Sequence, residues 1–304
     1  MPAQRRFGMD HEHYDWSPIS TRGVLRWPQD ARLALCVVVN LEHMEWSPPE
    51  DAWTAPLPGG WGHRPFTDLA RPSHREYGHR VGIFRVLDVL EKHGVKATIA
   101  MDALTAENYP YLVDHCLKRG CEVMGHGISA SRMISSRMTE QQEREYLGAS
   151  IEAIERATGS APVGWLGPGA GESPRTPQLL AEAGIRYLCD WANDEQPYPF
   201  KTGGGDLTAL PLMREMDDVA AIWERRLTES RYGELLKQCF DVMHEDGAAT
   251  GRLMAVNLHP WLIGQPFRIR YLDGALGHMM GAGGVWAATG SEITDWYREH
   301  PPAP

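Results

Sequence analysis

The sequence predicts an α/β fold, in which strands and helices alternate to form a distorted, TIM-like (β/α) barrel. Short apolar runs rich in β-branched residues alternate with longer amphipathic segments along most of the 304 residues, a pattern typical of α/β proteins. Polar side chains follow the ends of several of these runs, as they do in (β/α) barrels. The eight predicted strands are 32–40, 96–101, 122–125, 163–166, 186–190, 207–212, 253–258 and 285–289.

The segments between these runs predict helices. Residues 77–93 carry apolar side chains at helical spacing, and Gly94 follows as a C-cap. The helix predicted for 139–158 begins with Thr139 and Gln142, which form a capping-box pattern. Further helices are predicted at 106–119, 177–183, 232–245, 271–280 and 292–298, the last of which could cover the barrel.

One long segment interrupts the alternation. Residues 44–73 contain six prolines and three tryptophans, which predicts a loop. Loops of this length are uncommon in compact enzymes, so we expect a lid or a subunit contact, with a plain surface excursion as the alternative. The expected organisation is an N-terminal extension over 1–30, a single barrel domain over 31–299 that carries this loop, and a tail over 300–304.

Charge and hydropathy exclude several partners. The chain has 30 Lys and Arg against 40 Asp and Glu, a formal net charge of −10, and no basic cluster longer than two residues, so nucleic acid is not an expected partner. No apolar stretch approaches the length of a membrane span, and no apolar region follows Arg5 and Arg6 as in a signal peptide. We therefore expect a soluble, cytoplasmic protein with no membrane partner.

The cysteines predict neither a disulfide framework nor a structural zinc site. There are five, an odd number, and none are spaced as Cys-x-x-Cys. Cys189 precedes a candidate catalytic residue, but on a strand it should face the opposite side, so reduced and mostly buried thiols are expected.

The ends of the predicted strands collect residues suited to acid–base chemistry. Glu42 follows the first strand, His126 the third, Asp190 closes the fifth, and His259 follows the seventh. Together they supply a general base, an orienting carboxylate and a general acid, as the attack of water on an amide carbonyl requires. Candidate substrate-binding residues near these ends are Trp46, Trp165, Glu172, Trp191 and Trp261.

Six motifs in order resemble those of the polysaccharide deacetylase (NodB-homology) superfamily, and within it the allantoinase-like and cyclic-imide-hydrolase-like branch. They are Val-Asn-Leu-Glu-His (39–43), Arg-Glu-Tyr-Gly-His-Arg-Val-Gly (75–82), Gly-His-Gly (125–127), Gly-Trp-Leu-Gly-Pro-Gly (164–169), Asp-Trp-Ala-Asn-Asp-Glu-Gln-Pro-Tyr (190–198) and Leu-His-Pro-Trp-Leu-Ile-Gly-Gln-Pro (258–266). The resemblance covers roughly 32–297. It implies a NodB-type barrel with a catalytic carboxylate, a metal-binding histidine pair and a general-acid histidine.

The sequence departs from the metal-dependent members in two motifs. Where they have Asp-Asp and His-x-x-x-His, this chain has Glu42-His43 and the pair His126 and Ala130. Only His43 and His126 remain as candidate metal ligands, fewer than the three that a catalytic zinc site uses. No obligatory metal is therefore expected, the alternative being Zn²⁺ or another divalent ion. The arginine expected in the third motif is also absent, around 166–168.

These observations predict a hydrolase of amide or imide C–N bonds in a small molecule. Glu42 would accept a proton from water, His126 would position that water or polarise the carbonyl, and His259 would protonate the leaving nitrogen, with Asp190 orienting one histidine. Two alternatives are a metal-dependent deacetylase of N-acetylated sugars or polysaccharides and a non-catalytic binding protein on a degenerate barrel. A homo-oligomer is expected from the resemblance and from the apolar loop.

Overall fold

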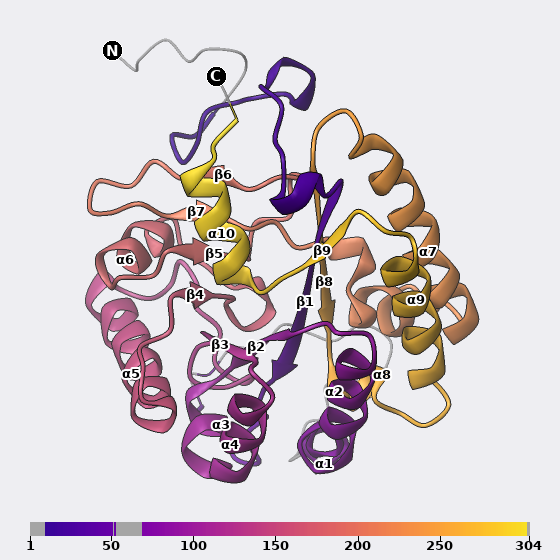
Figure 1. Cartoon of the computed structure of the whole chain (residues 1–304). Coiled ribbons are helices and arrows are strands. Elements are labelled where there is room, and N and C mark those ends of the chain that lie inside the picture. The colour runs from indigo at the N-terminus through magenta and orange to yellow at the C-terminus, as the bar shows by residue number, and fades with distance from the viewer. Residues whose placement is uncertain (1–9, 51, 53–68, 303–304) are drawn as a thin grey trace.

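A curled, mostly parallel sheet forms the centre of the computed structural model, which describes residues 10–50, 52 and 69–302. The strand order is β6-β7-β5-β4-β3-β2-β1-β8, with β9 pairing to β1, and of the described strands only β6 runs antiparallel to its neighbour. Figure 1 shows the sheet curling into an open half-barrel. The strands are β1 (Leu33–Leu41), β2 (Ala97–Met101), β3 (Glu122–Gly125), β4 (Gly164–Trp165), β5 (Tyr187–Leu188), β6 (Tyr198–Pro199), β7 (Thr208–Ala209), β8 (Arg252–Leu258) and β9 (Val285–Ala287).

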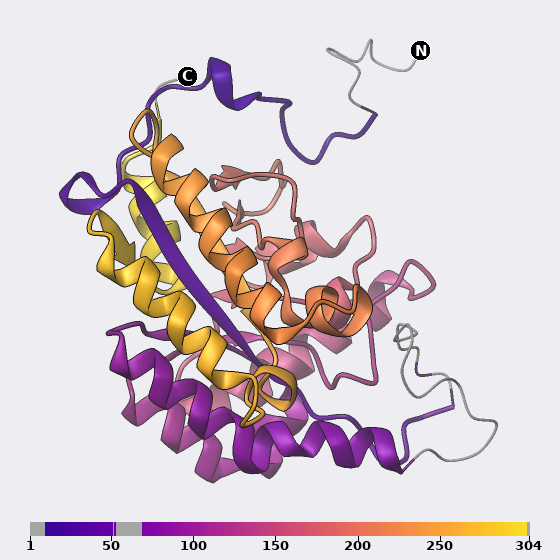
Figure 2. The same ribbon diagram turned by 90° about the vertical axis from the view of Figure 1, so that its right-hand side faces the viewer.

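Most helices form the outer layer around the sheet, whereas the last helix packs with Ile293 on the inner cluster (Figures 1 and 2). They are α1 (Ala70–Tyr77), α2 (Ile83–Lys92), α3 (Ala103–Asn108), α4 (Pro110–Lys118), α5 (Glu140–Thr158), α6 (Thr176–Glu182), α7 (Glu229–Asp246), α8 (Pro260–Ile263), α9 (Ile269–Gly281) and α10 (Gly290–Glu299). A π-helical turn, Gly78–Gly82, joins α1 to α2. Among the described residues, no helix is both long and apolar enough to cross a membrane.

The central strand β1 is buried along its whole length, as parallel strands covered on both faces are. Leu35, Val37 and Val39 pack in the core cluster that includes α2 and α9. Cys36 and Val38 belong to a second cluster inside the curled sheet. This alternation decides which residues beyond the strand enter the interior.

All eight predicted strands are present, and the (β/α) half-barrel confirms the predicted fold class. Three of them are only two residues long, and the antiparallel β6 was not predicted. Two other expectations were wrong at their boundaries. Residues 70–73 belong to α1 rather than to a loop, and the helix expected over 106–119 begins at Ala103 and is divided at Pro110, because proline has no N–H with which to continue a helix.

The structure describes only part of the rest of the predicted loop, because 51 and 53–68 lie outside the described residues. The predicted lid or subunit contact falls on that part. Within the predicted N-terminal extension, Leu25 and Trp27 are buried in the inner cluster, and Trp27 donates from Nε1 to the Arg252 carbonyl oxygen at 2.8 Å. At the other end of the chain, α10 packs against β5, and the Gly290 N–H donates to Thr98.

Candidate active site

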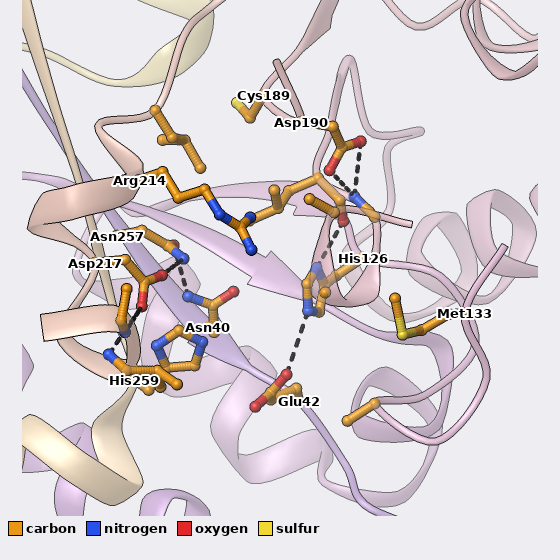
Figure 3. Close-up of a pocket in the computed structure, with 18 of the residues that line it drawn as sticks. Asn40, Glu42, His126, Met133, Cys189, Asp190, Arg214, Asp217, Asn257 and His259 are labelled. Carbon is orange, nitrogen blue, oxygen red and sulfur yellow. Dashed lines mark hydrogen bonds and ion pairs between the residues drawn. The ribbon is translucent and has the colours of Figure 1, made fainter. Parts of the chain in front are cut away.

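A pocket of about 180 Å³ lies at the carboxyl ends of the parallel strands, where residues at the ends of β1, β3, β4, β5, β7 and β8 converge (Figure 3). Active sites of (β/α) proteins lie at this edge because the loops that follow the strands meet there. All four predicted catalytic residues line the pocket, together with polar neighbours: Asn40, Glu42, His126, Asp190, Arg214, Asp217, Asn257 and His259.

Glu42 enters the pocket because it continues the inward alternation of β1. Its side chain is 9% exposed and forms an ion pair with Arg75 of α1. The Arg75 guanidinium also stacks on the Trp261 ring, 4.2 Å from the centroid. Burial alone would raise the pKa of Glu42, but Arg75 and the histidines His126 and His259 outweigh it and hold the pKa well below its usual range. Glu42 is therefore a stable carboxylate and a weak proton acceptor.

His126 follows β3, and its ring is held in one orientation by a backbone carbonyl. Nδ1 lies 2.6 Å from the Leu166 carbonyl oxygen, which can only accept, so Nδ1 carries the proton. Nε2 lies 3.6 Å from Oε2 of Glu42 and makes no hydrogen bond within the described part of the chain. In the neutral ring, Nε2 has a lone pair directed at the pocket.

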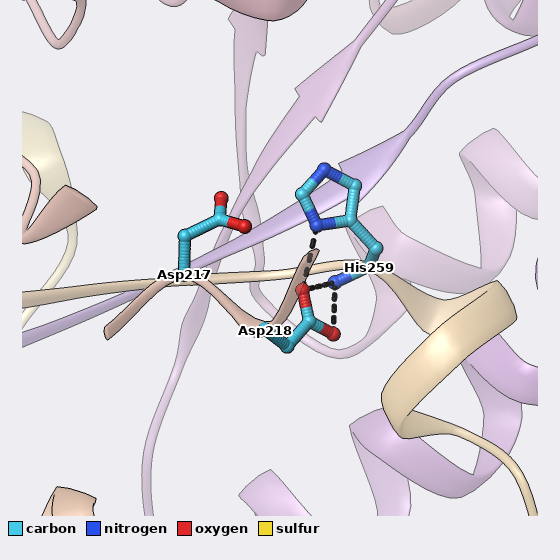
Figure 4. Close-up of side chains that lie close together, drawn as sticks. All are labelled: Asp217, Asp218 and His259. Atoms are coloured by element: carbon cyan, nitrogen blue, oxygen red, sulfur yellow. Dashed lines mark hydrogen bonds and ion pairs between the residues drawn. The ribbon is translucent and has the colours of Figure 1, made fainter. Parts of the chain in front are cut away.

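His259, which follows β8, is held by a carboxylate (Figure 4). Its Nδ1 lies 2.7 Å from Oδ1 of Asp218, and its backbone N–H also donates to both Asp218 oxygens. Burial would lower the pKa of His259, but Asp217, Asp218 and Glu42 raise it to about 9. For Asp218 the balance is reversed: burial raises its pKa although His259 opposes that shift. The imidazolium faces several carboxylates, whereas Asp218 faces only one cation.

Two buried amides extend this network and have a fixed orientation. The Asn40 amide donates from Nδ2 to Oδ1 of Asn257 at 2.7 Å and to the Leu258 carbonyl oxygen at 3.0 Å. Asn257 in turn donates from Nδ2 to Asp217 at 2.6 Å. Both hydrogens of the Asn40 side-chain amide therefore take part in hydrogen bonds. Its Oδ1 accepts no hydrogen bond from the described residues and faces the pocket as an acceptor (Figure 3).

Among the described residues Asp190 makes no hydrogen bond to a histidine, which corrects the orienting role expected for it. Both of its oxygens accept from the Gly167 N–H, at 2.9 and 3.1 Å. The carboxylate that directly holds a predicted catalytic histidine, His259, is Asp218. Asp190 instead adjoins Glu172, whose Oε2 accepts from the Trp191 indole at 2.8 Å.

The residues around Glu42 and His126 do not fit a three-ligand metal site. Arg75 occupies one oxygen of Glu42. Ala130, which has no donor atom, stands in the pocket wall. His43 has its ring directed elsewhere, with Nδ1 3.2 Å from the Tyr109 hydroxyl, and is not part of the pocket lining. The alternation along β1 places Glu42 and His43 on opposite sides.

Another group of potential ligands is Asp217, Asp218 and His259, whose ligand atoms lie within 4.8 Å of one another. Lone pairs of both carboxylates are already used in the hydrogen bonds described above. Both oxygens of Asp218 accept from His259, and Asp217 accepts from the Asn257 amide. This group therefore acts as a hydrogen-bonded support for the His259 imidazolium.

The predicted aromatic contacts lie outside the pocket lining. Trp165 is fully buried, because Gly125 has no side chain to fill the space that the indole takes. Trp261 is 2% exposed and lies behind Arg75. Trp46 is 39% exposed and donates to Glu76, and the half-buried Trp191 packs on residues of the N-terminal segment.

Arginines near the pocket differ in their partners. Arg132 pairs with Glu45, and Arg175 pairs with Glu143. The exposed cation that lines the pocket is Arg214, whose guanidinium points inward (Figure 3) and makes no hydrogen bond or ion pair with the described residues. His79 is buried, and its Nε2 lies 3.0 Å from the Thr105 hydroxyl.

Sequence reasoning did not identify Arg75, Asn257 or Asp218 as functional. Arg75 opens one of the recognised motifs, and Asn257 stands two residues before His259, so both were visible as candidates. Asp217 and Asp218 form an acidic pair after the predicted strand 207–212, which is the signal that could have identified them.

Comparison with known proteins shows a family match within the chain and similar proteins over most of its length. The polysaccharide deacetylase family profile matches residues 76–188. A Schizosaccharomyces pombe protein assigned by name to the polysaccharide deacetylases is 28% identical over 90% of this chain and 93% of its own length. A Helicobacter pylori peptidoglycan deacetylase is 32% identical over 42% of this chain and 43% of its own length.

Solved structures show the same fold over nearly the whole chain. The crystal structure of Puue allantoinase is 26% identical, with a TM-score of 0.82 over 91% of this chain and 94% of that one. A probable polysaccharide deacetylase from Pseudomonas aeruginosa PAO1 is 27% identical, with a TM-score of 0.81 over 91% and 95%. Residues 76–188 of this chain thus match the polysaccharide deacetylase family, and the chain shares the (β/α) fold of these solved structures over nearly its whole length.

Proposed function

We propose that this protein hydrolyses an amide, imide or ureide C–N bond in a small molecule without an obligatory metal. The observation that carries the proposal is the pair of histidines that face one pocket with different partners. His126 donates from Nδ1 to a backbone carbonyl and leaves Nε2 beside Glu42 without a hydrogen bond to the described residues, whereas the aspartates beside His259 raise its pKa to about 9. A base and an acid facing one cavity is the arrangement that amide hydrolysis needs.

The reaction follows from these groups. The attacking water donates one hydrogen to Nε2 of His126 and the other to Oε2 of Glu42, which lie 3.6 Å apart. As oxygen attacks the carbonyl carbon, its proton passes to His126, and Glu42 stabilises the imidazolium that forms. Glu42 itself is a poor base, because Arg75 stabilises its carboxylate. The proposal therefore assigns to His126 the base role expected of Glu42.

The other pocket residues complete the cycle. Arg214 donates to the oxyanion, and Oδ1 of Asn40 accepts the N–H of the scissile bond. His259 then gives its proton to the leaving nitrogen, and the C–N bond breaks. A substrate without this N–H leaves the Asn40 oxygen unpaired in the pocket, which disfavours its binding.

The size of the pocket favours a small substrate. About 180 Å³ is bounded by residues from six strand ends, whereas a polymer requires an open groove. The similarity to an allantoinase structure also supports a small amide or ureide. A second candidate, an N-acetyl-sugar deacetylase, is favoured by the name of the Helicobacter pylori relative.

The test is the release of amine or ammonia from succinimide, hydantoin, allantoin, N-formyl and N-acetyl amines and diacetylchitobiose, with metal content measured before and after chelation. We expect turnover of a cyclic imide or ureide that survives chelation. His126→Ala should abolish it, and the matched His43→Ala should not, because His43 lies outside the pocket lining. Activity on the chitobiose alone, lost on chelation and in both variants, would instead establish a metal-dependent deacetylase.

A further inference from the structure

One wall of the pocket comes from a single segment of chain between β7 and α7. Within it, Arg214–Met216 forms a 3₁₀ turn and Val219–Glu224 forms a π-helical turn. The pocket-lining residues of this segment are Arg214, Asp217, Val219, Ala220 and Glu224. A buried hydrogen bond anchors the segment, because the Tyr232 hydroxyl of α7 donates to the Met216 carbonyl oxygen at 2.9 Å. The wall is therefore held against the rest of the fold.

The two ends of this segment place opposite charges at the pocket. Residues five apart lie on one face of a π-helical turn, so Glu224 lies beside Val219, and both line the pocket. The Arg214 guanidinium points into the same pocket (Figure 3). The sequence neighbours of these two charges, Glu215 and Arg225, are not part of the pocket lining and pair with each other at 3.2 Å. That ion pair joins the two ends of the segment.

Arg214 and Glu224 face one pocket without pairing. Neither side chain forms an ion pair or a hydrogen bond with another of the described residues, and both are exposed. The carboxylates deeper in the pocket differ, since Glu42 pairs with Arg75 and Asp217 accepts from the Asn257 amide. One donor group and one acceptor group at this wall are thus open to a ligand.

A pair of opposite charges selects for a group that is neutral overall. A lone anion on the ligand would be attracted by Arg214 but repelled by Glu224, and a lone cation would meet the reverse. A carbamoyl group, H₂N–C=O, has an acceptor next to a donor and can satisfy both residues. It also loses less hydration on entering the pocket than a zwitterion does, because it carries no full charge. The guanidinium has several N–H donors on two edges, so Arg214 can bind this carbonyl as well as the oxyanion.

We propose that Arg214 and Glu224 form a second subsite of the pocket, which binds a carbamoyl group of the substrate. Arg214 donates to the carbonyl oxygen of that group, and Glu224 accepts from its nitrogen. The inference rests on the proposed function and deepens it, because it names a part of the substrate other than the bond that is cleaved.

The test compares four hydantoins that differ only in the group at ring carbon 5. Hydantoin-5-acetamide carries a carbamoyl group, hydantoin-5-acetic acid a carboxylate, 5-(2-aminoethyl)hydantoin an ammonium group and 5-propylhydantoin an apolar group. Their dissociation constants are measured by titration calorimetry and, where they are hydrolysed, kcat/KM is measured as well. Wild type should favour the acetamide over each of the other three by about tenfold or more, because a hydrogen bond to a charged group is lost in each comparison.

Two variants should change this selectivity in opposite directions. Arg214→Gln leaves Glu224 alone and should favour the ammonium compound, whereas Glu224→Gln leaves Arg214 alone and should favour the carboxylate, each by about tenfold relative to the acetamide. Ratios between compounds are compared, so an effect of Arg214 on the oxyanion, which all four share, cancels. Glu234→Gln is the matched control: Glu234 pairs with Lys237 on α7, outside the pocket lining, and its loss changes the net charge equally.

Equal affinity of wild type for the acetamide and the propyl compound, or no measurable binding of the acetamide, would overturn the inference. A wild-type preference for the carboxylate or the ammonium compound, or the same shift in Glu234→Gln, would do so too. Selective binding of the acetamide without hydrolysis of any compound would support the subsite and count against the proposed function only. Hydrolysis without this selectivity would do the reverse.

Discussion

Replacing Asp218 with Asn removes the carboxylate that holds His259. In the native protein, Asp218 is fully buried and accepts from both the ring and the backbone of His259, at 2.7 to 3.1 Å. An Asn at this position has one acceptor for two donors, and its amide hydrogens face the imidazole. We expect the pKa of His259 to fall from about 9 towards or below its ordinary value, because burial then opposes the charged form with one fewer carboxylate against it.

The size of the effect follows from the pKa of His259, about 9 in the folded protein against an ordinary value of 6.5. Each pKa unit corresponds to about 1.4 kcal/mol, so protonated His259 contributes on the order of 3 kcal/mol to the free energy of unfolding. Because the folded pKa is the higher one, this stabilisation is complete below about pH 6.5 and is lost as the pH rises through about 9. The loss of this stabilisation is therefore measured between roughly pH 6.5 and 10. Lower pH values are avoided, because the pKa of Asp218 is itself raised.

The assay is urea unfolding of wild type and Asp218→Asn at several pH values in that window. The difference in unfolding free energy should be larger at about pH 6.5 than at about pH 10, by at most about 3 kcal/mol, because Asp217 and Glu42 still raise the pKa of His259 in the variant. Asp273→Asn is the matched control: Asp273 lies 2.6 Å from Nε2 of His93 but is 33% exposed, so its loss should cost under about 1 kcal/mol at every pH. A difference for Asp218→Asn that does not depend on pH would refute the reasoning.

Three further predictions concern other parts of the chain. Glu42→Gln should lower kcat/KM by at least about 100-fold with the far-ultraviolet circular dichroism unchanged, and full turnover would exclude Glu42 from the reaction. Gly82→Ala should destabilise the protein by several kcal/mol in thermal unfolding, because the new Cβ would lie 2.0 Å from the carbonyl oxygen of Pro260, the residue that begins α8. The control, Gly148→Ala in the open part of α5, should stabilise the protein by about 0.5 to 1 kcal/mol. Native thiols should resist Ellman's reagent at about pH 8, because burial raises the pKa of Cys36 to about 12 and that of Cys239 to about 11; rapid reaction of several thiols would contradict this.

The sequence alone determined the strands and the edge at which the chemistry gathers. A run such as Leu33–Leu41 is apolar at nearly every position, so its burial on both faces could be read directly. In a parallel sheet all carboxyl ends lie at one edge, which places Glu42, His126 and His259 together without knowledge of any contact. The period-two alternation likewise predicted that Glu42 and His43 face opposite ways.

Only the tertiary structure decided which partner each of these residues has. Arg75 reaches Glu42 from a helix 33 positions along the chain, and Asp218 reaches His259 across 41 positions. Such pairs depend on how helices and loops pack on the sheet, and no local pattern records that packing. Asp190 was correctly placed near the pocket, but whether it meets a histidine or a peptide N–H depends on the backbone path after β4. Spacing along a chain predicts which face a side chain occupies, whereas the atom that it meets is set by long-range packing.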